Sequence, residues 1–142
     1  MAHENMKQIA HTIAQQYGLA FVILFGSVAR GKEREKSDVD IAVLREDRVP
    51  LSYVQFSDIA EAFARTLEGT FTKVDLVDLA CANILLRYEI AAGGTLLAGN
   101  EDVYEAYRRF AFRDYVDSQS LRDLEETLIR KRQAEIHRTL NA

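Results

Sequence analysis

The sequence has one cysteine in 142 residues and no apolar run long enough to cross a membrane. A single cysteine, Cys81, permits no disulfide within the chain, which favours a reducing compartment, so we expect a cytoplasmic protein. A membrane helix needs roughly 20 consecutive apolar residues, whereas the longest apolar run, 19–25, has the length of a strand. The first residues also lack the basic and then apolar order of a signal peptide. We therefore expect no contact with a membrane.

The chain also has no excess of positive charge. Its net charge is −4, with 48% hydrophobic and 28% charged residues, a balance typical of soluble globular proteins. Because proteins that bind nucleic acid generally carry a basic face, we expect no stable binding of nucleic acid. A nucleotide substrate stays compatible, since bound cations can neutralise its phosphates. The length predicts one domain over residues 1–142.

Apolar periodicity predicts an α/β fold in which a small mixed sheet of about four strands is packed with helices. Strands are predicted over 19–25, 38–44, 71–77 and 95–98, and helices over 3–17, 56–67 and 78–92. The continuous apolar strand 19–25 is predicted to be central and buried on both faces. After a core of about residues 6–99, a helical tail is predicted over about 102–142, with a polar break at 117–120.

Helix boundaries are indicated by residues that favour caps and turns. Gly18 is predicted to end the first helix, Gly69 the second, and the glycine pair 93–94 the third. Asp78 is predicted to cap the third helix, because its carboxylate can accept hydrogen bonds from the unpaired N–H groups there. Cys81 lies among apolar residues of that helix and is predicted to be a buried thiol.

The strongest indication of chemistry lies where the first strand ends at Gly26 and Ser27 and, ten residues later, Asp38 and Asp40 open the next strand. Side chains two residues apart in a strand lie on one face, about 6 to 7 Å apart at Cα. Two such carboxylates can hold divalent cations. Gly26 lets the backbone pass close to a ligand, and Ser27 offers a hydroxyl and an amide to a phosphate. A solvated loop with two surface carboxylates is the simpler alternative, which the two flanking apolar strands disfavour.

A third carboxylate is predicted in the strand 71–77. Asp75 lies there on one face with Lys73. If that face is shared with Asp38 and Asp40, three like charges meet, and such a cluster is costly unless cations compensate it. The pattern thus predicts a three-carboxylate metal site, and an aspartate that merely faces water is the alternative.

Other polar residues carry weaker signals. Arg30 is the basic residue nearest to the glycine-serine pair, and it either contacts a triphosphate or belongs to a solvated, charged loop. The three histidines are too scattered to predict a zinc site. Arg132 and His137 have the Arg-x4-His spacing of HEPN ribonucleases, but the α/β order upstream differs from a HEPN helical bundle. We therefore assign no nuclease site.

The pattern of Gly26 and Ser27, then Asp38 and Asp40, then Asp75 in a later strand resembles the nucleotidyltransferase superfamily of DNA polymerase beta. The fuller strings Phe-Gly-Ser-Val-Ala-Arg-Gly and Ser-Asp-Val-Asp-Ile-Ala-Val look like those of the minimal nucleotidyltransferases, or MNT proteins. Other members of the superfamily append domains that hold the acceptor, whereas here only the helical tail follows. The resemblance therefore implies that a partner supplies the acceptor.

Bacterial MNT proteins of this kind resemble the antitoxins of type VII-like HEPN/MNT toxin-antitoxin modules. The resemblance implies a protein adenylyltransferase that moves AMP from ATP to a tyrosine of a cognate HEPN toxin, in a hetero-oligomer with it. It also implies two Mg²⁺ ions bound by the catalytic residues Asp38, Asp40 and Asp75, and a triphosphate bound by Gly26, Ser27 and Arg30. Two alternatives stay open, namely a small-molecule acceptor such as an aminoglycoside, and neutralisation by contact alone with a vestigial nucleotide site.

Overall fold

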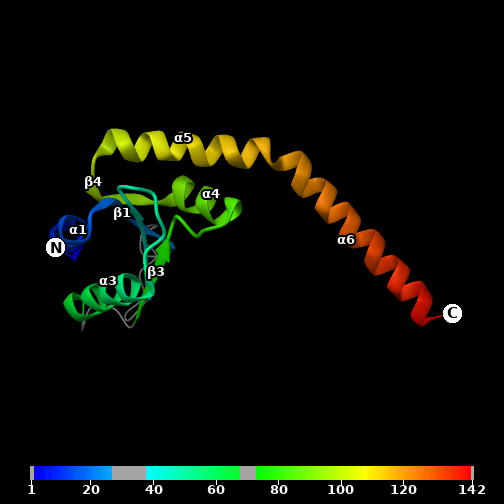
Figure 1. Ribbon diagram of the computed structural model, residues 1–142, viewed down its shortest axis with the longest axis horizontal. Coiled ribbons are helices and arrows are strands. Elements are labelled where there is room, and N and C mark those ends of the chain that lie inside the picture. Colours follow the sequence, from blue (N-terminus) through cyan, green and yellow to red (C-terminus); the bar gives the residue numbers. More distant parts are fainter. Residues whose placement is uncertain (1, 27–37, 68–72, 142) are drawn as a thin grey trace.

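The computed structural model describes residues 2–26, 38–67 and 73–141 (Figure 1). The helices are α1 (Ala2–Tyr17), α3 (Tyr53–Thr66), α4 (Ile84–Gly93), α5 (Glu101–Asp117) and α6 (Gln119–Leu140). The strands are β1 (Leu19–Phe25), β2 (Val39–Arg45), β3 (Val74–Asp78) and β4 (Thr95–Gly99). The predicted α/β fold with a mixed four-stranded sheet is confirmed. The single domain over residues 1–142 stays a prediction.

The strand order is β3-β2-β1-β4, in which β1 is antiparallel to β2 and β4, and β2 is parallel to β3. A parallel pair needs a crossover connection, and α3 lies in the connection between β2 and β3. Because β1 and β2 are antiparallel, the end of β1 and the start of β2 lie at one edge of the sheet. The start of β3 lies at the same edge.

Both faces of the sheet are covered by helices. On one face, α1 and α3 pack against Val22, Leu24 and Ile41; on the other, α4 and α5 pack against Phe21 and Ile23. Neighbouring residues of β1 therefore belong to opposite cores, and the expectation of a central strand buried on both faces is confirmed. Because side chains alternate along a strand, the even-numbered residues of β2 point to the α4 and α5 face.

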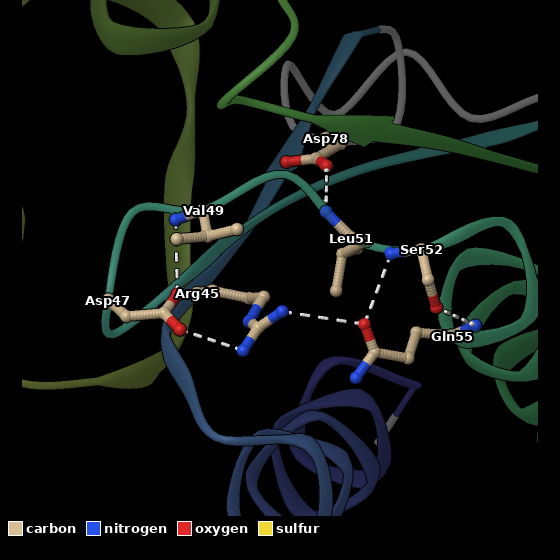
Figure 2. Close-up of polar contacts among 7 residues, drawn as sticks. All are labelled: Arg45, Asp47, Val49, Leu51, Ser52, Gln55 and Asp78. Carbon is tan, nitrogen blue, oxygen red and sulfur yellow. Dashed lines mark hydrogen bonds and ion pairs between the residues drawn. The ribbon is translucent and has the colours of Figure 1, made fainter.

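The third helix begins later than the sequence predicts. Asn83 caps α4, accepting a hydrogen bond at Oδ1 from Leu86 N at 2.8 Å. Asp78 instead ends β3, where it is 8% exposed and accepts a hydrogen bond from Leu51 N at 2.8 Å (Figure 2). It also accepts from Ala80 N at 3.0 Å. The predicted cap at Asp78 is wrong because this carboxylate ties β3 to the connection between β2 and α3. Cys81 is exposed, so the predicted buried thiol is also wrong.

That connection is held by further polar contacts (Figure 2). Asp47 pairs with Arg45 at 2.7 Å through Oδ2 and accepts from Val49 N at 3.0 Å through Oδ1. Ser52 and Gln55 then form a capping box at the start of α3. These bonds fix a tight turn over residues 45–48.

The helical tail is confirmed, and its two helices differ in burial. In α5, Tyr104, Tyr107 and Ala111 are buried against the sheet, whereas α6 has no buried residue. In Figure 1, α6 extends away from the rest of the molecule. Arg122 braces the junction by donating to Tyr115 O at 2.6 Å. The large apolar side chains exposed on α6 are Leu121, Leu124, Leu128, Ile129, Ile136 and Leu140.

The predicted helix ends are partly confirmed. Gly18 follows α1 with a φ of 64°, a left-handed conformation that favours glycine, and Gly94 is the C-cap of α4. The predicted stop at Gly69 lies outside the described residues. Within the described part of the chain, no helix is both long and apolar enough to span a bilayer.

Candidate active site

The structure brings the three predicted aspartates to one edge of the sheet. Asp40 lies in β2 with Phe25 of β1 and Asp75 of β3 as its Cα partners. Asp38 directly precedes β2, two residues from Asp40 and therefore on the same side of the strand. Val77, two residues after Asp75, packs into the core beneath α4 and α5, so Asp75 points to that face as well.

The electrostatics of Asp40 reflect this grouping. Burial raises the pKa of the Asp40 carboxyl, and the negative charges of Asp75 and then Asp38 raise it further. Each cause penalises the ionised form. A cation at this edge would relieve the repulsion and also replace water lost through burial. The three carboxylates offer the hard oxygen ligands that Mg²⁺ prefers, so their chemistry fits such an ion, although the described side chains are not gathered into a metal-binding group in this structure.

Gly26 lies against Asp40, and two observations favour glycine at this position. Its φ is 76°, which side chains with a Cβ rarely adopt. A Cβ at this position would also overlap the Asp40 carboxylate. The group that approaches Gly26 in this structure is the Asp40 side chain, and a close approach to a ligand stays a prediction.

Lys73 is a residue of the site to which the sequence analysis gave no role. Its Nζ lies 3.1 Å from Asp75 Oδ1, with the two side chains 66% and 43% exposed. The hydrogen bond to Asp75 and the charge of Asp75 raise the pKa of the Lys73 ammonium. Desolvation opposes them, and the charge of Asp38 adds the smallest of these effects, again upward. A lysine two residues before an aspartate in a strand shares its face, and that spacing was the signal available in the sequence.

The remaining predicted site residues, Ser27 and Arg30, lie outside the described residues. Over residues 2–26, 38–67 and 73–141, no three histidine, cysteine, aspartate or glutamate side chains form a ready-made metal-binding group. The roles of Asp38, Asp40 and Asp75 as metal ligands stay a prediction.

Comparison with known proteins shows the family to which the chain belongs. A family model described as polymerase beta, nucleotidyltransferase matches residues 7–103, which include Gly26 and all three aspartates. The chain belongs to this nucleotidyltransferase family. The resemblance inferred from the spacing of glycine, serine and aspartates is thereby confirmed. The match ends in the first turn of α5.

The chain is 34% identical over 89 residues to the protein adenylyltransferase MntA of Shewanella oneidensis, a match over 63% of this chain and 60% of that relative. The aligned region thus spans less than two thirds of that relative. The structure is similar to one chain of a toxin-antitoxin crystal structure with AMP-PNP, with a TM-score of 0.74 and 26% identity over 87% of this chain and 97% of that chain.

A structure of tri-AMPylated Shewanella oneidensis HEPN toxin in complex with an MNT antitoxin contains another similar chain. Its TM-score is 0.71 at 25% identity, over 91% of this chain and 98% of that chain. The unmatched 9% of 142 residues is about 13 residues, fewer than the 22 residues of α6. The similarity to this nucleotidyltransferase structure therefore reaches into the projecting helix.

Proposed function

We propose that this chain is the antitoxin of a HEPN/MNT pair and acts as a protein adenylyltransferase, transferring AMP from ATP to a tyrosine of its cognate HEPN toxin. The observation that carries the proposal is the approach of Gly26, Asp40 and Asp75 at one edge of a nucleotidyltransferase sheet. The similar chains belong to toxin-antitoxin complexes, one with AMP-PNP and one with an AMPylated toxin. They favour a protein acceptor over an aminoglycoside.

In the proposed site, Asp38, Asp40 and Asp75 hold two Mg²⁺ ions, while Gly26, Ser27 and Arg30 bind the triphosphate. When bound, the ions neutralise phosphate charge and stabilise the attacking and leaving oxygens. Asp40 lies on the middle one of the three strands and supplies a partly buried carboxylate.

The chemistry asked of the protein's own groups is positioning and proton transfer. The tyrosine oxygen attacks the α-phosphorus of ATP, the bond from that phosphorus to the bridging oxygen breaks, and pyrophosphate leaves. Asp75, exposed at the edge of the cluster, accepts the tyrosine proton. Lys73 lies beside Asp75 and, in this proposal, orients that carboxylate.

The toxin is proposed to bind along α6. That helix buries none of its residues against the sheet and exposes six large apolar side chains, including Leu124 and Ile136. Exposed apolar surface of this kind marks interaction sites. Two points support a cytoplasmic location: the proposed use of ATP, and the single cysteine, Cys81, which can form no disulfide within the chain.

The test is incorporation of AMP into the purified HEPN partner, measured by intact mass with ATP and Mg²⁺. Asp75→Asn should lower the rate by about two to four orders of magnitude, because it removes the proton acceptor. The exposed Asp58→Asn on α3 is the matched control and should behave as wild type. Chelation with EDTA should abolish transfer.

Three other results would contradict parts of the proposal. No mass increase with the wild-type chain would overturn the activity. A normal rate for Asp75→Asn would overturn its role as proton acceptor. Full rescue of growth by Asp75→Asn without a mass increase would show that contact alone neutralises the toxin.

A further inference from the structure

We propose that α6 is a self-association surface, on which the α6 of a second copy of this chain lies antiparallel to form a homodimer. The helix has 22 residues and buries none of them, and in Figure 1 it extends away from the sheet, so a second helix can lie along it. The other two exposed apolar residues, Leu124 and Leu140, lie at the margins of what we call the apolar face of α6. That face consists of four side chains that are 52% to 58% exposed: Leu121, Leu128, Ile129 and Ile136.

The apolar face encloses two charges of opposite sign, Glu125 and Arg132. Residues four apart are neighbours on a helix surface, and each of the two charged residues has a residue of the apolar face four positions before it and another four positions after it. Both side chains are exposed, and neither forms an ion pair with another described residue. A surface of this kind fits a partner that offers apolar side chains and the opposite charge at matching positions.

A second copy of α6 offers those charges at the matching positions. Glu125 lies three residues before Leu128, and Arg132 lies three residues after Ile129. The two charges are therefore symmetric about the midpoint between residues 128 and 129. Two antiparallel helices related by a twofold axis at this midpoint bring Glu125 of each copy opposite Arg132 of the other, so the pairing forms two ion pairs.

The apolar residues obey the same symmetry. Leu121 lies seven residues before Leu128, and Ile136 lies seven residues after Ile129. A spacing of seven keeps side chains on the contact face of paired helices. In the antiparallel pair, Leu121 meets Ile136 of the second copy, and Leu128 meets Ile129. The same register thus matches both the charges and the apolar side chains.

The charge distribution along α6 favours the antiparallel direction. Residues 119–129 include three acidic side chains and one arginine, whereas residues 130–140 include four lysine or arginine side chains and one glutamate. Antiparallel helices place the acidic half against the basic half, while parallel helices would oppose like charges. The antiparallel direction also places the two cores at opposite ends of a helix pair about 33 Å long, where they do not collide.

The contact is small, which sets its strength. One face of one helix is less than the roughly 800 Å² that each partner contributes to a standard interface, so we expect a dissociation constant of about 10–100 µM. The same helix is proposed above to bind the HEPN toxin, so the toxin and the second copy compete for it. Only this competition depends on the proposed function.

The test is sedimentation equilibrium of the full chain alone, over about 5–500 µM. The wild-type chain should show a reversible equilibrium of monomer and dimer. Glu125→Arg turns both ion pairs into repulsions and should weaken the dimer at least about tenfold, as should Arg132→Glu. The matched control is Asp123→Arg, which makes the same change of charge on the opposite side of α6 and should dimerise as the wild type does.

Charge exchange tests the pairing itself. A chain that carries both Glu125→Arg and Arg132→Glu should regain the wild-type dissociation constant, and an equimolar mixture of the two single variants should form heterodimers. A wild-type chain that stays monomeric up to about 500 µM would overturn the proposal. Single variants that dimerise as the wild type does, or a double variant that is not restored, would overturn the antiparallel pairing.

A last titration adds the HEPN partner. Cys81 is exposed and is the single cysteine of the chain, so donor and acceptor dyes attached to it report pairing of two copies by energy transfer. Loss of transfer when the HEPN partner is added supports the competition. Transfer that persists in the complex and is still abolished by Glu125→Arg would overturn the competition, while the self-association would stand.

Discussion

Replacing Gly26 with alanine should damage catalysis far more than stability. The residue has a φ of 76°, and an alanine held in the left-handed conformation costs about 1–2 kcal/mol. That cost alone lowers the stability of a domain whose total is only about 5–15 kcal/mol, but it does not unfold it. The added methyl group has a second and more specific effect.

That effect is displacement of Asp40. A Cβ on Gly26 would overlap the Asp40 carboxylate, which must move by about 1 Å to restore normal contact. A misplacement of about 1 Å at a reacting centre can cost on the order of 100-fold in rate. We therefore expect Gly26→Ala to reduce AMP transfer by about two orders of magnitude while the free energy of unfolding falls by about 1–2 kcal/mol.

Gly18 is the matched control. It also has a left-handed backbone, with a φ of 64°, but a Cβ there would meet no atom within 4 Å. Gly18→Ala should therefore also lower the free energy of unfolding by about 1–2 kcal/mol in urea titrations, and it should leave the rate of AMP transfer unchanged. The difference in rate between the two variants isolates the contact with Asp40.

The assay pairs urea unfolding with the initial rate of AMP incorporation into the HEPN partner. If Gly26→Ala transfers AMP at the rate of Gly18→Ala, the close approach to Asp40 has no catalytic importance. If both variants lose activity together, backbone strain rather than the position of the carboxylate is responsible.

Three further predictions follow from other contacts. Asp78→Ala leaves two backbone N–H groups without their acceptor and should lower the free energy of unfolding by about 2–4 kcal/mol in urea titrations. The control Asp47→Ala, at an exposed position, should lower it by about 1 kcal/mol or less. Equal losses would contradict the structural role of Asp78. Truncation after Ser118 should leave the thermal unfolding midpoint nearly unchanged, because α6 buries no residue. The same truncation should abolish capture of the HEPN partner. Retained capture would exclude α6 as the docking surface. Lys73→Met removes the ammonium group that competes with Mg²⁺ for Asp75. The Mg²⁺ concentration for half-maximal AMP transfer should therefore fall, by no more than a few-fold. A rise in that concentration would instead indicate that Lys73 binds the phosphates.

The edge of the sheet that carries the aspartates was predictable because its signals are local. The glycine ends an apolar strand, and residues 38 and 40 share a face through the two-residue period of a strand. Their alignment with Asp75 needed only one further strand, and it is present as a Cα pair in the parallel β2 and β3 ladder.

Features that depend on distant segments were not predictable in this way. Asp78 has the composition of a helix cap, but its partner is Leu51, 27 residues away. The start of α4 was misplaced for the same reason, since Asn83 is as good a cap as Asp78.

The isolation of α6 has a consequence for the dynamics of the chain. Because α6 buries no residue, it is stabilised mainly by its own backbone bonds, by the contact of Arg122 with Tyr115 at the junction with α5, and by local pairs such as Arg130 with Glu126. Isolated helices are marginal in water. Backbone amides of α6 should therefore exchange with deuterium much faster than those of β1, which lie between two cores. A partner that binds α6 has to supply the free energy that keeps the helix formed, so its affinity depends on the helical propensity of residues that never touch it.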